Sequence, residues 1–211
     1  GDRVISRDII PNARSRNIEF SVSALRPHTQ VYGFFDGVDV TKYCVPKILE
    51  ISMVSGTFQV GETVRGTMRP VGNTATSETD PTISFRLAQA NHKEGAFNSP
   101  SRVYNFDQII PSSYSSTSTT LNVDTFSLSD QPQGSFTGRV APNMILVGET
   151  SGALATVTQV RLVTDISATL IGSFFIPDSN VPSNPSFTTG TKTIVFIDDE
   201  NNDVKNASTR A

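Results

Sequence analysis

Two carboxylates, Asp36 and Asp39, lie beside Gly37 directly after the apolar run VYGFF. Paired carboxylates that share a proton carry out the chemistry of aspartic proteases. The loop of those enzymes has Ser or Thr between Asp and Gly and occurs twice, whereas Gly37 follows Asp36 directly and no second copy exists. Asp-Gly between apolar stretches is instead typical of a hairpin turn, because Gly accepts positive φ and Asp tolerates it. We therefore predict a turn at Asp36-Gly37 and not a catalytic pair.

A second pair of carboxylates, Glu62 and Glu149, belongs to a phrase that occurs twice. The pattern apolar-x-Val-Gly-Glu-Thr occupies residues 58–63 and 145–150. Two carboxylates are what a glycosidase uses, but each Glu follows Gly in an expected tight turn. We therefore predict surface exposure and an ordinary pKa for both. The repeat has two explanations: two related β units in one chain, or the same local hairpin used twice in a small barrel.

The acidic cluster near the C-terminus has part of a calcium-binding pattern. Asp199, Asn201 and Asp203 place oxygen ligands at alternating positions, as at the start of a calcium loop. Val204 stands where that loop needs Gly, and no Glu follows at the right distance. We predict a solvated turn between strands.

Cys44 is the single cysteine, which excludes an intrachain disulfide. Zinc would need more ligands than His28 and His92 supply. Because no His lies near Cys44, we predict a buried small hydrophobe and not a reactive thiol. No Ser-His-Asp spacing, G-x-S-x-G motif or P-loop occurs either. We assign no catalytic, metal-binding or cofactor-binding residue, and we expect no cofactor.

Apolar alternation predicts strands towards both ends of the chain. Ile18, Phe20 and Val22 share one face of 18–25. Similar stretches predict the other strands of this part: 31–35, 38–45, 169–178 and 191–198. Abundant Thr, Val, Phe and Ile, with frequent Gly and Pro, also favour β structure. The predicted fold class is all-β.

The order of these strands predicts a nested layout. Residues 17–47 and 168–198 each hold too few strands for a sandwich alone, but together they supply an Ig-like β-sandwich. The section 48–167 is then an inserted small β-barrel-like domain, whose two ends must lie close together. Residues 1–16 are expected to be a linker or lead-in, and 199–211 a linker to a missing C-terminal part. Inside the insertion, we predict a strand at 82–90 and an ordered extended segment over 109–128.

Aromatic residues raise the question of contact surfaces. The adjacent pairs Phe34–Phe35 and Phe174–Phe175 put one ring on each side of a strand. The outward rings need a cover, which the insertion, another subunit or a partner protein could supply. Exposed tyrosines could also bind sugars, although the absence of Trp counts against this. The available residues are Tyr32, Tyr43, Tyr104 and Tyr114.

Charge and hydropathy exclude some classes of partner. A net charge of −3 argues against a nucleic-acid-binding face. No apolar run approaches the roughly 20 residues that cross a bilayer, and GDRVISRDII lacks the layout of a signal peptide.

Six phrases follow one another along the chain: SRNIEFSVSALRPHTQVYGFFDGVDVTKYC, FQVGETVRG, NHKEGAFNSPS, LNVDTFSL, MILVGETSGALATVTQVRLV and GSFFIPDSNVPSNPSFTTGTKT. Together they resemble large virion structural proteins of tailed phages, in particular T4-like myoviruses that infect marine cyanobacteria. The resemblance runs from residue 1 to about 198. In that family such segments occur within long, mostly β tail-fibre, baseplate or other appendage proteins.

The resemblance implies a structural, non-enzymatic module of a virion, and it carries over no catalytic residues. Its partners would be other virion proteins and further copies of itself, often as a trimer. It would be located in the virion, which is assembled in the host cytoplasm. An alternative is a host-recognition module that binds a cell-surface glycan through loops around 72–81 and 91–120. A third hypothesis, a hydrolytic enzyme, would need the carboxylates named above to cluster.

Overall fold

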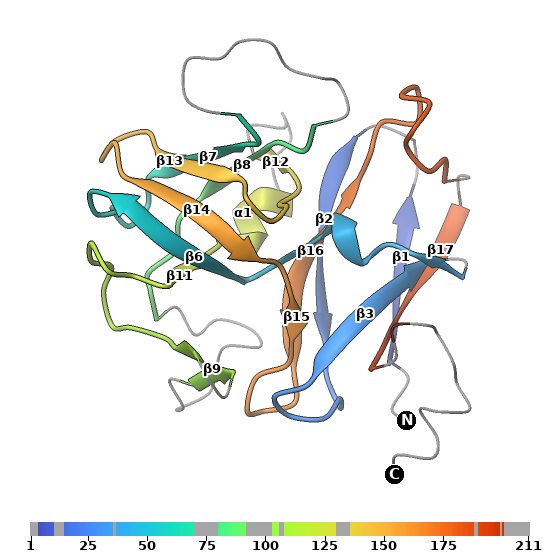
Figure 1. Cartoon of the computed structure of the whole chain (residues 1–211). Helices are drawn as coiled ribbons and strands as arrows, with labels where there is room; N and C mark the ends of the chain where they lie inside the picture. The colour runs from blue at the N-terminus through green and yellow to red at the C-terminus, as the bar shows by residue number, and fades with distance from the viewer. Residues whose placement is uncertain are drawn as a thin grey trace.

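The structure is a computed structural model that describes residues 4–10, 15–35, 37–69, 80–91, 103–105, 108–129, 136–187, 190–198 and 200. Within these ranges strands make up nearly all of the regular structure, and they pair in antiparallel sheets. The strands form a β-sandwich and, beside it, a curled half-barrel (Figure 1). The all-β class predicted from the sequence is confirmed.

The sandwich is built from the two ends of the chain. One sheet has the order β1-β17-β3-β15, with β4 paired to β3, and the other has the order β2-β16-β5. Aromatic rings meet between the sheets: the ring centroids of Phe20 and Phe196 lie 4.7 Å apart, and those of Phe35 and Phe174 lie 6.0 Å apart. The strand bounds are β1 (Val4–Ile10), β2 (Arg16–Val22), β3 (Gln30–Phe35), β4 (Val38–Asp39), β5 (Cys44–Pro46), β15 (Leu162–Val163), β16 (Leu170–Ile176) and β17 (Gly190–Ile197).

Two boundaries predicted from the sequence are wrong. Residues 1–16 are not all a linker, because β1 pairs with β17 from Val4 opposite Phe196 to Ile10 opposite Gly190. The insertion also ends earlier than residue 167, because β15 pairs with β3 in the sandwich. Each of these strands is defined by backbone hydrogen bonds to a partner that is far away in the sequence. Such bonds leave little trace in the local sequence pattern. The predicted linker 199–211 lies outside the described residues, apart from Glu200.

The half-barrel is built from the middle of the chain. Its sheet has the order β11-β6-β14-β13-β7-β8-β12. The two sides of the curl approach where Leu87, after β8, bridges Val123, after β11. Apolar side chains fill the inside, including the fully buried Leu49, Phe85 and Leu146. The bounds are β6 (Ile48–Ser55), β7 (Thr63–Thr67), β8 (Ile83–Arg86), β11 (Thr120–Asn122), β12 (Thr137–Gly138), β13 (Ile145–Gly148) and β14 (Leu154–Gln159), with a separate hairpin of β9 (Val103–Asn105) and β10 (Gln108–Ile109).

One helical turn interrupts the predicted extended segment 109–128. The segment is a strand at β11, but it continues as the helix α1 (Thr125–Ser129). Asp124 caps this helix, because its Oδ1 accepts a hydrogen bond from the N–H of Ser127 at 3.0 Å. The turn buries Leu128 in the half-barrel core. A similar short 3-10 helix, η1 (Thr41–Tyr43), interrupts the predicted strand 38–45.

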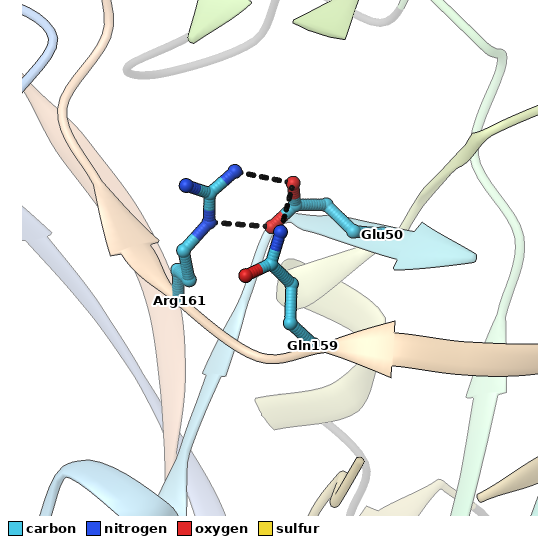
Figure 2. A network of polar contacts seen from close by, with 3 residues as sticks. All are labelled: Glu50, Gln159 and Arg161. Carbon is cyan, nitrogen blue, oxygen red and sulfur yellow. Dashed lines mark hydrogen bonds and ion pairs between the residues drawn. The ribbon is translucent and has the colours of Figure 1, made fainter. Parts of the chain in front are cut away.

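The chain crosses between the sandwich and the half-barrel at two points that lie together. Lys47 separates β5 from β6, and residues 160–161 separate β14 from β15. Because β6 and β14 pair, Gln159 lies opposite Glu50. The buried carboxylate of Glu50 accepts hydrogen bonds from Nε and Nη2 of Arg161 at 2.8 and 2.5 Å and from Nε2 of Gln159 at 3.2 Å (Figure 2). The two ends of the middle section are therefore held together.

Candidate functional site

Glu62 is buried, contrary to the prediction of surface exposure. Its Oε1 accepts hydrogen bonds from the N–H of Gln59 at 2.7 Å and the hydroxyl of Ser151 at 2.8 Å. Its Oε2 accepts from the N–H groups of Thr150 and Ser151 at 3.0 and 2.9 Å. Burial alone would raise the pKa of Glu62, but these hydrogen bonds outweigh it and lower the pKa. The prediction of an ordinary pKa is also wrong, because four donors favour the charged form.

The two Val-Gly-Glu-Thr phrases contact each other but differ in conformation. In the first, Gly61 has a φ of +83° in a turn, and β7 begins at Thr63. In the second, β13 runs to Gly148, and the turn follows it. Val64 pairs with Gly148, and the N–H of Glu149 donates to the carbonyl of Thr63 at 2.9 Å. The explanation that both phrases form the same local hairpin is therefore wrong.

Glu149 has the exposed position that was predicted for it. Its side chain is 42% exposed and forms an ion pair with Arg65 on the neighbouring strand β7. The carboxylate of Glu62 instead lies against Gly148, where an added Cβ would come within 2.6 Å of Oε1. The two glutamates thus have separate tasks. Glu62 ties the loop after β6 to the turn after β13, and Glu149 joins β13 and β7 at the surface.

The hairpin predicted around Gly37 is confirmed. Gly37 has a φ of +77°, and β3 pairs with β4 so that Phe35 lies opposite Val38. Asp36 lies outside the described residues. The Oδ1 of Asp39 accepts a hydrogen bond from the N–H of Thr41 at 2.8 Å, which fixes the chain at the start of η1.

Cys44 is buried, as predicted for a small hydrophobe. Its Sγ donates a weak hydrogen bond to the carbonyl of Val40 at 3.6 Å. Burial, with a smaller contribution from the charge of Asp39, raises the pKa of the thiol far above its ordinary value. The buried thiol is therefore protonated at neutral pH.

The remaining metal candidates fall largely outside the described residues, among them His92, Asp199, Asn201 and Asp203. Within the described ranges, no group of three or more His, Cys, Asp or Glu side chains could hold a metal ion. None of the described helices is long and apolar enough to span a membrane.

The adjacent phenylalanines are covered by the chain itself. Phe34, Phe35 and Phe174 are all buried. Phe175 is partly buried and packs on the core of the sandwich. The outward rings therefore do not form the open contact surface that the alternation of side chains suggested.

A cleft of about 600 Å³ lies between the sandwich and the half-barrel, where no sequence motif pointed. Its sandwich side includes Tyr32, Asp39 and Lys42, and its half-barrel side runs from Arg139 to Pro142. The complete lining described is Tyr32, Asp39, Thr41, Lys42, Arg139, Val140, Ala141, Pro142, Val160 and Glu200. Because these residues come from separate segments, sequence spacing could not have assembled them.

Two cations share one aromatic ring at the edge of this cleft. Nζ of Lys42 lies 5.1 Å, and Cζ of Arg139 5.2 Å, from the ring centroid of Tyr43. Both distances are within the range of cation–π attraction. Burial lowers the pKa of Arg139, an effect that the nearby Tyr43 opposes. The cleft thus combines two cations with carboxylates, hydroxyls and apolar side chains.

The loops predicted for glycan binding are only partly described. Residues 70–79 and 92–102 lie outside the described ranges, and so does the side chain of Tyr104. Tyr114 has a structural position, because its hydroxyl donates to the carbonyl of Ala88 at 2.7 Å and accepts from the N–H of Asn122 at 3.1 Å. Among the predicted tyrosines, Tyr32 lines the cleft and Tyr43 supports its two cations.

Comparisons of the chain with family models, with curated proteins and with solved structures found no match.

Proposed function

We propose that the chain is a non-enzymatic structural module of a tailed-phage virion, in a tail fibre, baseplate or similar appendage, that acts by protein–protein assembly. The resemblance of its six phrases to virion proteins of T4-like phages of cyanobacteria supports this proposal. The structural observation that carries it is the pair of Arg161 with the buried Glu50, which holds together the two crossings between the sandwich and the half-barrel. A braced unit suits assembly, because a preorganised surface loses little conformational freedom when it binds.

The partners in this proposal are other virion proteins and further copies of the chain, with a trimer as one arrangement. Exposed apolar side chains support it, since assembly contacts bury such groups. Those in the described part of the chain are Val38, Val54, Val60, Phe126 and Ile166. The net charge of −3 gives no reason to include nucleic acid or a membrane among the partners.

Purified particles provide the test of this proposal. Antibodies raised against the chain would be applied to gradient-purified virions of a phage that encodes it, together with mass spectrometry of the same particles. We expect its peptides in intact particles and gold label on a tail appendage. Peptides found only in the infected-cell lysate would contradict a virion location, and label on the capsid would contradict an appendage.

A host-surface glycan-binding module is the second candidate, and the cleft beside Tyr43 favours it. Saccharide sites combine an apolar or aromatic wall with a few polar groups that fix orientation. Tyr32, Thr41 and Asp39 supply such polar groups, and Pro142 and Val160 supply apolar surface. A glycan array probed with the full chain tests this function, and no binding to any glycan would count against it.

A further inference from the structure

Arg139 is a half-buried cation whose charge has no ion-pair partner within the described part of the chain. Its guanidinium lies over the ring of Tyr43, and its backbone N–H donates to the carbonyl of Thr82 at 3.0 Å. Lys42, which is exposed, lies over the same ring. Two positive charges therefore share one aromatic ring at the edge of a cleft.

Such an arrangement favours a negatively charged group in the cleft. Burying a cation is unfavourable unless it is paired and hydrogen-bonded. The ring offsets part of this cost, but it provides no acceptor for the N–H donors of the guanidinium. A carboxylate would supply that acceptor, because its two oxygens match the planar fork of Arg.

The other lining groups limit how much negative charge a ligand can bring. The carboxylates of Asp39 and Glu200 balance the charges of Lys42 and Arg139. A polysaccharide with many sulfates or phosphates would therefore be repelled by these two carboxylates. The two acidic side chains can instead accept hydrogen bonds from hydroxyl groups. A volume of about 600 Å³ is in the usual range for small-ligand sites. These features together select a ligand with one carboxylate and several hydroxyls.

We propose that this cleft binds an acidic saccharide, a uronic acid unit of a polysaccharide, with its carboxylate held by Arg139 and Lys42. The sugar ring lies against Pro142 and Val160, and its hydroxyls face Asp39 and Thr41. This inference rests on the second candidate function and names its ligand class.

The test is an NMR titration of the full chain with D-glucuronate at constant ionic strength. Methyl β-D-glucopyranoside is the neutral control sugar, and acetate is the control carboxylate. We expect amide shifts at Thr41 and Lys42 with glucuronate, and binding at least tenfold weaker with either control ligand. Arg139→Gln and the exposed Lys42→Gln should each weaken glucuronate binding several-fold. Arg65→Gln, at an arginine outside the cleft lining, should leave it unchanged.

Each opposing result overturns a defined part of the proposal. If the neutral sugar binds as tightly as glucuronate, the cations do not recognise the ligand's carboxylate. If acetate binds as tightly as glucuronate, the cleft does not recognise the sugar ring. Unchanged affinity in Lys42→Gln, which does not depend on a buried side chain, overturns the site even if Arg139→Gln fails to fold. Binding of neutral glycans on the array without glucuronate binding leaves glycan recognition standing and overturns this inference alone. If no saccharide binds, both this inference and the second candidate function are overturned.

Discussion

The side-chain amide of Asn17 pairs with the backbone of Gly138 through two hydrogen bonds, as a neighbouring strand would. Nδ2 donates to the carbonyl of Gly138 and Oδ1 accepts from its N–H, both at 2.9 Å. Asn17 belongs to β2 of the sandwich, and Gly138 lies on β12 at the edge of the half-barrel sheet. The buried side chain of Asn17, from the sandwich, thus pairs with the edge strand β12 of the half-barrel sheet.

Asn17→Leu should destabilise the chain by about 3 kcal/mol, because it leaves the buried N–H and C=O of Gly138 without partners. Urea unfolding at neutral pH would measure the change. Asn91→Leu is the control, since Asn91 is exposed and the change should stay within about 0.5 kcal/mol. Equal effects at the two positions would refute the pairing as a source of stability.

Gly138→Ala should reduce the free energy of unfolding more than the same substitution at a glycine that has open space around it. Gly138 has a φ of +118°, and an added Cβ would lie 2.0 Å from the carbonyl oxygen of Thr82. We expect a loss of about 4 kcal/mol or failure to fold. Gly37→Ala is the matched control, because its φ is +77° but no atom lies within 4 Å, so the cost should be about 1 kcal/mol. Thermal unfolding of both variants checks the order, and a smaller effect at Gly138 would contradict it.

Glu62→Gln should reduce stability at neutral pH and have little effect in acid. The pKa of Glu62 is lower in the folded state than in the unfolded chain. Its contribution is therefore present above the unfolded pKa of about 4.3 and is lost as the pH falls through the folded value. At pH 7 we expect a loss of about 2 kcal/mol, since a Gln amide would turn N–H groups towards backbone donors.

Denaturant unfolding at a series of pH values checks this prediction. The curves of Glu62→Gln and the parent chain should converge as the pH falls below the folded pKa. Glu149→Gln provides the comparison, because its exposed pair with Arg65 should contribute less than about 1 kcal/mol. If the difference in unfolding free energy between Glu62→Gln and the parent chain did not depend on pH, the shape of the Glu62 side chain, and not its charge, would set its contribution to stability.

Arg161→Met should destabilise the chain by about 3–5 kcal/mol, because it leaves the buried carboxylate of Glu50 without its ion-pair partner. The double variant Glu50→Leu/Arg161→Met removes both charges and should recover much of that loss. A double-mutant cycle from chemical denaturation measures the coupling between the two residues. Additive losses would show that the ion pair does not couple the two crossings.

The sequence predicted features that depend on neighbouring residues. The alternation of Phe20 and Val22 marked β2, and the Asp-Gly pair marked the β3–β4 hairpin, because both signals lie within a few positions. The burial of Cys44 was also predictable, since no activating group stands near it in the sequence.

Features that depend on distant segments were not predictable in the same way. Glu62 looked like a turn residue, but the donors that bury it come from Thr150 and Ser151, 88 and 89 positions away. The strand β1 carries charged residues and is defined by its partner β17. Arg139 has no local motif at all, because the ring of Tyr43 and the other side of the cleft come from the N-terminal part of the chain.

The adjacent crossings at Lys47 and Arg161 also bear on how such a protein can diversify. The middle section leaves and re-enters the sandwich on the paired strands β6 and β14, beside the Glu50–Arg161 pair. Recombination at these two points would exchange the half-barrel as a cassette. The pairing of β16 with β2 and of β17 with β3 involves only strands outside the cassette. The sandwich can therefore keep its own strand pairing when the half-barrel is exchanged, provided that the new unit also presents backbone groups to Asn17.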